Sequence, residues 1–168
     1  LAISQSGASP DLVALTRKAA AGGAKTVALL NTPDSPLGRA VDKILPLTAG
    51  PERSVAATKS FVATLVAVTA IHAGQTGDSA LLDELMTLPA VLRSQQDGAK
   101  PDFRPLARTR RLFCLGRGLG LAIAGEAALK FKETSGMHAE AYSAAEVLHG
   151  PVALVERRFP VIGLAARD

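Results

Sequence analysis

One pattern occurs twice in this chain and limits its possible folds: a short apolar segment, a turn of glycines or serines, and then an alanine-rich helix. The first copy joins residues 1–4 to the turn "SQSGAS", and Ser9 followed by Pro10 is typical of a helix start. The second copy joins "RRLFCLG" to "GRGLG" and to a helix from about Leu119. Between the two copies, "KTVALL" and "KILPL" are strands of the buried type, separated by a short predicted helix, "SPLGRAVD". The sequence therefore predicts an α/β fold in which parallel sheets are flanked by helices, in two similar lobes.

The boundary between the lobes follows from composition. The stretch "DGAKPDFRP" is rich in proline, glycine and charge, and we expect it to form a linker over residues 97–105, between a first lobe at 1–96 and a second lobe at 106–168. The first lobe should also contain two long helices, "PERSVAATKSFVATLVAVTAIHAG" with an irregular entrance and "SALLDELMTLPAVLRSQQ". Because the chain starts in one apparent strand and stops in another, "PVIGLAARD", we expect both lobes to be incomplete and the chain to be part of a longer protein.

Charge and composition narrow the possible partners. The net charge of +4 suggests nucleic-acid binding, but aromatic residues are only 4% of the chain and no stacking motif accompanies its arginines, so we expect no nucleic-acid partner. The longest apolar stretch, "FVATLVAVTAI", is shorter than the roughly 18 residues of a membrane span and is predicted to be a buried helix. Cys114 is the only cysteine, which excludes an internal disulfide and a multi-cysteine metal site and favours a cytoplasmic location. We expect neither a metal nor a cofactor.

Serines gather in the first turn, where the strand meets the helix. Free backbone N–H groups and the positive end of the helix dipole point at this place, which favours an anion. The hydroxyls of Ser4, Ser6 and Ser9 add donors, and Gly7 allows the backbone to approach a ligand. The alternative is that Ser9 only caps the helix and the other serines only form the turn. No "GxxxxGK" motif is present, so a small phosphorylated ligand is favoured over a nucleoside triphosphate.

The glycine-rich turn of the second copy differs from a dinucleotide fingerprint. Its glycines stand at 116, 118 and 120, whereas the fingerprint needs the third glycine one position later, where Leu121 stands. We therefore interpret "GRGLG" as a tight turn.

Titratable residues gather on the helix that follows this turn. Glu126, Lys130 and Glu133 are spaced i, i+4 and i+7, so all three side chains lie on one face. The arrangement suits a catalytic carboxylate with a neighbouring ammonium group, but the same spacing is also typical of an ordinary salt-bridge stripe. Downstream, "HAE" matches part of a zinc deaminase motif, but the required cysteine pair is missing. His149 precedes Gly150 at a predicted helix end, where a histidine often serves as a cap.

Several motifs, taken in order, resemble those of one family. "ISQSGAS", "GPERSVAATKSF", "EAALKFKE" and "HAEAYSAAEVLHGP", with the spacing between them, are similar to the tandem sugar isomerase (SIS) family, and the likeness spans nearly the whole chain. The resemblance implies a flavodoxin-like three-layer fold in each lobe. It also implies that Ser4, Gln5, Ser6 and Ser9 form a phosphate-binding loop. It further implies that Val55 and Ala56 belong to a backbone segment that contacts the sugar.

The resemblance also implies a mechanism. Glu133 would be the base that moves a proton between C1 and C2 of the sugar, with Lys130 and Glu126 beside it. His149 would open the sugar ring in a neighbouring subunit, so that a homodimer shares its active sites. The apolar helix containing Phe61, Leu65 and Val68 is expected near the subunit contact.

The implied activity is an aldose–ketose isomerase that acts on an amino-sugar phosphate, converting glucosamine 6-phosphate to fructose 6-phosphate and ammonia without a glutaminase domain. One alternative is the isomerase half of a glutamine–fructose-6-phosphate aminotransferase, which would run in the other direction. Another is a sugar-phosphate sensor, which would keep the serine turn but would not need Glu133, Lys130 and His149 together. Because the family's first strand and its C-terminal lysine segment are absent here, we expect the chain alone to be inactive.

Overall fold

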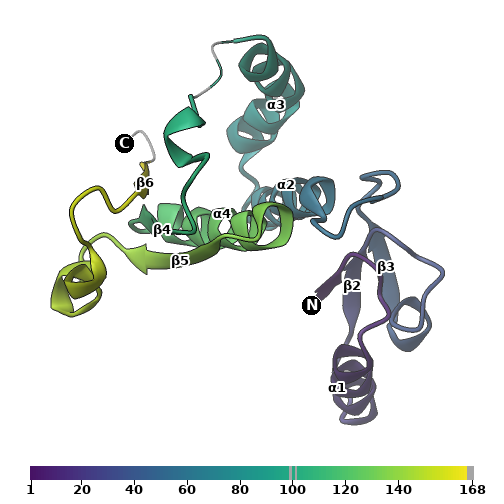
Figure 1. Cartoon of the computed structure of the whole chain (residues 1–168). Coiled ribbons are helices and arrows are strands. Elements are labelled where there is room, and N and C mark those ends of the chain that lie inside the picture. Colours follow the sequence, from purple (N-terminus) through teal and green to yellow (C-terminus); the bar gives the residue numbers. More distant parts are fainter. Residues whose placement is uncertain (99, 101, 166–168) are drawn as a thin grey trace. The chain divides into compact units, whose positions relative to one another are not determined.

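The chain divides into two compact units, residues 1–99 and 100–168. Each unit contains a three-stranded parallel sheet with helices packed on it, as Figure 1 shows, and the predicted α/β architecture is therefore confirmed. The computed structural model describes residues 1–98, 100 and 102–165. No helix in this described part combines the length and the hydropathy that a membrane span requires.

The sheet of the first unit has the strand order β1-β2-β3. Strand β1 (Ala2–Ser4) pairs with the central strand β2 (Val27–Leu30), which pairs with β3 (Lys43–Pro46). Helix α1 (Pro10–Ala21) connects β1 to β2, and Val13 joins the buried cluster beneath it. Serine 9 stands at the N-cap position and Pro10 at the first helical position, as the sequence predicts.

The predicted helix "SPLGRAVD" is wrong, because only a 3-10 turn, Gly38–Ala40, forms there. Two close contacts explain the short turn. A Cβ atom on Gly38 would lie 2.1 Å from the carbonyl oxygen of Pro33, so the backbone folds back too tightly for a regular helix. At the far end, the Asp42 N–H donates to the Thr26 hydroxyl at 3.0 Å, which draws the chain into β3.

Two long helices complete the first unit. Helix α2 (Thr58–Thr76) has the irregular entrance that the sequence predicts, and α3 (Ser79–Asp97) packs against it after an Asp78 cap. The prediction that the apolar helix is buried is wrong for its own unit, since Val62, Leu65 and Val68 are 37%, 44% and 40% exposed. The helix is apolar on all sides, whereas α3 covers only part of it.

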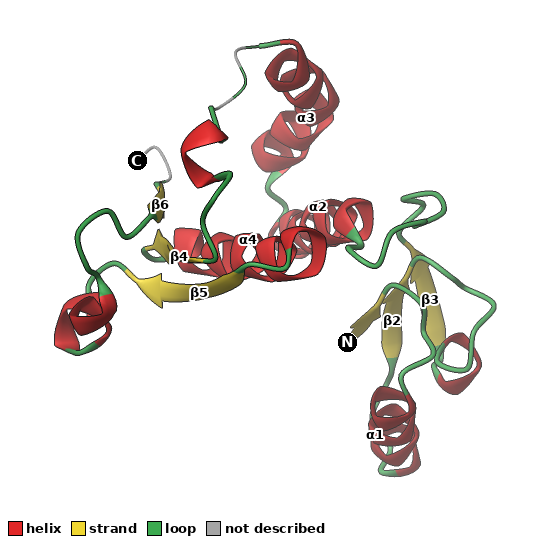
Figure 2. Cartoon of the chain, in the orientation of Figure 1, coloured by secondary structure: helices red, strands yellow, loops and turns green. Residues whose placement is uncertain are grey.

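The sheet of the second unit has the order β5-β4-β6 (Figure 2). Strand β4 (Arg111–Gly116) lies in the centre and is followed by helix α4 (Leu119–Ser135), β5 (His138–Ser143) and, after two 3-10 turns, β6 (Val161–Leu164). Helix α4 places Ala124 and Ala128 against β4 and β5, with Leu112 and Cys114 in the same core. The side of α4 that faces away from the sheet exposes apolar side chains such as Ile123 and Leu129 beside polar ones.

Candidate functional site

The serine turn of the first unit is held in shape by its own side chains. The Ser4 Oγ accepts a hydrogen bond from the Gly7 N–H at 3.0 Å, and the Ser6 Oγ accepts one from the Ala8 N–H at 3.3 Å. Gly7 is buried and has a φ of 62°, a conformation that glycine adopts at little cost. The turn between strand β1 and helix α1 is therefore a compact loop, and it lies at the carboxyl edge of the sheet.

The Ser9 hydroxyl is not used by helix α1. The Ser9 backbone carbonyl accepts from the Val13 N–H at 3.1 Å, but within the described chain its side chain makes no capping hydrogen bond. A capping serine ordinarily satisfies one of the first helical N–H groups. The hydroxyl and the helix N-terminus are thus both available to a ligand, which favours the anion-binding interpretation over simple capping.

The segment that contains Val55 and Ala56 lies in the same unit, just before α2. Val55 is 88% exposed, whereas Ala56 is buried. The segment is fixed by Glu52, whose Oε1 accepts from the Ser60 N–H at 2.8 Å and from the Ser60 hydroxyl at 3.0 Å. These hydrogen bonds, the backbone one first, hold the pKa of the Glu52 carboxyl below its usual value. Sequence reasoning missed Glu52, because it stands well before the N-cap position, Ala57, and no local capping pattern points to it.

The predicted catalytic group of the second unit comes together on α4. The Lys130 Nζ lies 2.9 Å from the Glu126 Oε1 and 3.1 Å from the Glu133 Oε2. The side chains of Glu126, Lys130 and Glu133 are only 20%, 21% and 24% exposed. The hydrogen bond to Glu126 and the pairing with Glu133 raise the pKa of Lys130, so its ammonium stays charged at neutral pH.

This arrangement differs from a freely solvated stripe, because partial burial strengthens the interactions between the charges. A carboxylate at Glu133 can accept a proton, and the charged Lys130 can stabilise negative charge that develops on a neighbouring oxygen. The geometry therefore permits proton transfer next to a carbonyl group.

His149 is not brought to this group within the described chain. It ends the 3-10 turn Glu146–His149, is exposed, and has no ion pair with the described residues. The serine loop and Val55 belong to the first unit, and the α4 group and His149 belong to the second.

A second polar cluster lies on edge strand β5, in the stretch that the sequence analysis considered only for a zinc site. The Tyr142 hydroxyl donates to Glu140, and the His138 Nε2 lies 3.2 Å from the other Glu140 oxygen. The Tyr142 hydrogen bond is the main cause that lowers the pKa of Glu140, and the same bond raises the pKa of Tyr142. The i, i+2, i+4 spacing, which places all three side chains on one face of a strand, was the available signal.

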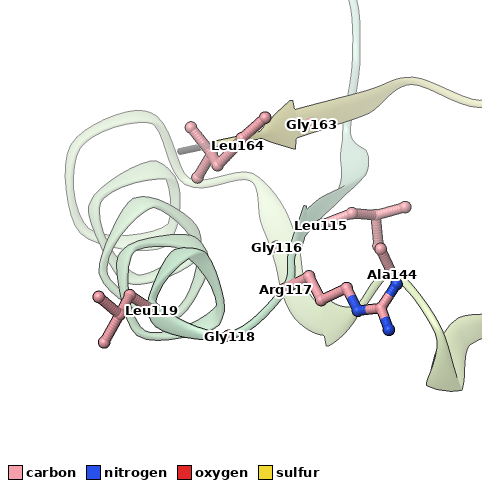
Figure 3. Close-up of a pocket in the computed structure, with 9 residues that line it drawn as sticks. Leu115, Gly116, Arg117, Gly118, Leu119, Ala144, Gly163 and Leu164 are labelled. Carbon is pink, nitrogen blue, oxygen red and sulfur yellow. The ribbon is translucent and has the colours of Figure 1, made fainter. Parts of the chain in front are cut away.

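A pocket of about 810 Å³ lies at the carboxyl ends of β4 and β6. Figure 3 shows that its lining includes Gly116 and Arg117, the first turn of α4, and Ala144 after β5. The "GRGLG" segment is a tight turn as predicted, since a Cβ atom on Gly116 would lie 2.1 Å from the Gly120 carbonyl oxygen. None of the predicted site residues lines this pocket.

Two further kinds of site, a metal site and a reactive cysteine, can be considered among the described residues. No group of three or more histidine, cysteine, aspartate or glutamate side chains in the described part of the chain could hold a metal ion. Cys114 is fully buried in β4, and burial raises the pKa of its thiol, so it is not an activated nucleophile.

The chain is similar to known proteins, both to a family model and to individual relatives. A family model described as the SIS domain matches residues 1–73 and 105–168. The isomerizing glutamine–fructose-6-phosphate aminotransferase of Rhizobium leguminosarum bv. viciae is 39% identical over 181 residues, which cover 100% of this chain and 30% of that protein.

Two solved structures are also similar. A candidate phosphosugar isomerase from Silicibacter pomeroyi DSS-3 is 50% identical with a TM-score of 0.91, and the match covers 99% of this chain and 51% of that one. The C-terminal domain of a glucosamine–fructose-6-phosphate aminotransferase from Francisella tularensis is 32% identical with a TM-score of 0.83, covering 99% of this chain and 50% of that one. This chain thus spans about half of the solved relatives and less than a third of the curated one.

Proposed function

Because this chain belongs to the SIS domain family, we propose that it forms part of an aldose–ketose isomerase that acts on an amino-sugar phosphate. The first candidate reaction converts glucosamine 6-phosphate and water to fructose 6-phosphate and ammonia. The observation that carries the proposal is the partly buried group of Glu126, Lys130 and Glu133 on one face of α4. A domain that only senses sugar phosphates has no need of such a group.

The serine loop is the proposed phosphate site. Ser4, Gln5, Ser6 and Ser9 lie between the end of β1 and the N-terminus of α1, where backbone N–H groups and the helix dipole favour a dianion. The uncommitted Ser9 hydroxyl supports this role. Val55 and the backbone at Ala56, which Glu52 holds in place through Ser60, are proposed to contact the sugar.

Glu133 is the proposed base. In the open-chain aldose its carboxylate removes the proton from C2, the C–H electrons form a C1–C2 double bond, and the carbonyl oxygen at C1 takes up negative charge. Lys130 stabilises this charge, and Glu126 keeps the ammonium in position. Return of the proton to C1, with transfer of a proton from the C2 amine to the C1 oxygen, gives a sugar with a hydroxyl on C1 and an imine at C2. Water then adds to the imine carbon, and loss of ammonia leaves the ketone.

His149 is proposed to open the sugar ring in the site of a neighbouring subunit, since histidine can both give and accept a proton near neutral pH. Its exposed position, away from any ion pair with the described residues, is compatible with a role in a second subunit's site. The exposed apolar side chains of Leu65 and Val68 are consistent with a homodimer. The lone, buried Cys114 thiol supports a reducing, cytoplasmic setting.

A second candidate is the synthase reaction, from fructose 6-phosphate and glutamine-derived ammonia to glucosamine 6-phosphate. The observation in its favour is the 39% identity to an isomerizing aminotransferase. The same α4 group would serve both directions, because proton transfer between C1 and C2 is reversible.

One experiment separates the candidates. The complete protein is incubated with glucosamine 6-phosphate in one reaction and with fructose 6-phosphate plus glutamine in another, and both ammonia and sugar products are assayed. Ammonia release from glucosamine 6-phosphate alone supports the deaminating isomerase, and glutamine-dependent glucosamine 6-phosphate supports the synthase. Absence of both products, with intact sugar-phosphate binding, would leave the sensor.

A further inference from the structure

The central strand of the first sheet is followed by a segment that touches both neighbouring loops. Because β2 lies between β1 and β3 in a parallel sheet, residues 31–37 leave the sheet between the serine loop, which follows β1, and residues 47–50, which follow β3. Polar contacts run from this segment to each side.

On one side, Asn31 clamps the loop after β3. Its Nδ2 donates to the Gly50 carbonyl at 2.8 Å, and its Oδ1 accepts from the Ala49 N–H at 2.9 Å. The loop is bent sharply, with φ values of 50° at Thr48 and 73° at Gly50. A non-glycine residue such as Thr48 keeps this conformation only where its surroundings hold it. The clamped loop leads directly into the segment of Val55.

On the other side, Ser35 supports the serine loop. Ser35 is 3% exposed, and a Cβ atom on Gly7 would lie 2.1 Å from its Oγ, so the loop backbone rests on this side chain. The Ser35 Oγ also accepts from the Gly38 N–H at 3.2 Å. Two residues on, the Leu37 N–H donates to the Gly7 carbonyl at 2.9 Å. The path of the serine loop is therefore set by the segment after β2.

We infer that Asn31 and Ser35 are positioning residues, which fix the distance between the phosphate loop and the sugar-contacting segment without touching the substrate. This inference rests on the proposed function of these two loops. The amide of Asn31 is needed as donor and acceptor at once, and Ser35 is needed for both its size and its hydroxyl. Misplacement of a substrate by about 1 Å can reduce a rate on the order of 100-fold, so small shifts of either loop should be measurable.

The test uses variants of the complete protein. Asn31→Asp keeps the size and the acceptor for Ala49 but places a carboxylate oxygen against the Gly50 carbonyl, and should lower kcat/KM for the sugar phosphate by about 10- to 100-fold. Ser35→Ala should raise KM for the phosphorylated sugar by about 10-fold with little change in kcat. Asp34→Asn is the matched control, because the Asp34 side chain is 95% exposed and pairs only with Arg39 among the described residues; it should leave both constants unchanged.

The results distinguish this inference from the proposed function. If the wild-type protein is active and both variants match Asp34→Asn, the inference is overturned and the proposed function stands. If the wild-type protein is inactive on both sugar phosphates, the proposed function fails, and hydrogen exchange decides the inference. Faster exchange of the Ala49 amide in Asn31→Asp, and of the Leu37 amide in Ser35→Ala, would support positioning of the loops, and unchanged exchange would overturn it. Asn31→Ser, which is shorter and uncharged, replaces Asn31→Asp if the latter does not fold.

Discussion

Replacement of Gly7 by alanine should disrupt the serine loop, and the contacts of Gly7 give the size of the expected loss in the free energy of unfolding. The new Cβ would lie 2.1 Å from the Ser35 Oγ and 2.8 Å from the Ser35 Cβ, and the residue would have to keep a φ of 62°. An alanine in the left-handed conformation costs about 1–2 kcal/mol, and overpacking costs about 1–3 kcal/mol. The free energy of unfolding should therefore fall by about 2–5 kcal/mol.

Gly23→Ala is the matched control in the same unit. Gly23 has a φ of 87°, but a Cβ there meets nothing within 4 Å, so this variant should lose only the conformational term of about 1–2 kcal/mol. Urea denaturation measures both variants, and Gly7→Ala should also raise KM for the sugar phosphate. Gly7→Ala should cost less in a Ser35→Gly background than in the wild-type protein, because the clashing atoms are then absent. Equal destabilisation by Gly7→Ala and Gly23→Ala would refute the close contact with Ser35.

Three further predictions concern phosphate binding, the shared site and pH. Ser6→Ala should weaken binding of a sugar phosphate by the roughly 1.5–3 kcal/mol of a hydrogen bond to a charged group and leave the unphosphorylated sugar unaffected in calorimetry; equal losses would exclude phosphate contact. Mixing Glu133→Gln with His149→Ala subunits should restore activity in hybrid dimers, whereas hybrids without activity would place His149 outside a shared site. The hydrogen bonds from Ser60 hold the folded pKa of the Glu52 carboxyl below its ordinary value, so its contribution to stability is present above that ordinary value and is lost as the pH falls through the folded pKa. The stability difference between wild type and Glu52→Gln, measured by urea denaturation, should therefore shrink in acid. A difference that does not change with pH would contradict this role of the Glu52 carboxylate.

Local sequence patterns predicted most of the helices and strands, and they also predicted the group of charged side chains on α4. The i, i+4, i+7 spacing was sufficient to place Glu126, Lys130 and Glu133 together, because a helix fixes this geometry without help from the rest of the fold. The start of α1 was likewise readable from Ser9 and Pro10.

Contacts between distant residues could not be read in the same way. Asn31 and Gly50 are 19 residues apart, and their hydrogen bond exists only because β2 and β3 are neighbours. The 3-10 turn that replaces a predicted helix depends on a close approach of Gly38 to the Pro33 carbonyl, which no periodicity reveals. The exposure of Leu65 and Val68 on α2 was missed, since apolar composition alone predicts burial.

The central claim, that Glu133 transfers a proton between C1 and C2, is tested most directly by solvent exchange. The complete protein is incubated with sugar phosphate in deuterated water, and incorporation of deuterium at C1 and C2 is followed by NMR. Glu133→Gln keeps the shape of the side chain but removes its basicity, so it should bind substrate with near wild-type affinity and exchange at least about 100-fold more slowly. Glu156→Gln, which removes only an exposed ion pair with Arg111, is the control and should exchange at the wild-type rate. Undiminished exchange in Glu133→Gln would contradict the account and leave the α4 group as a salt bridge.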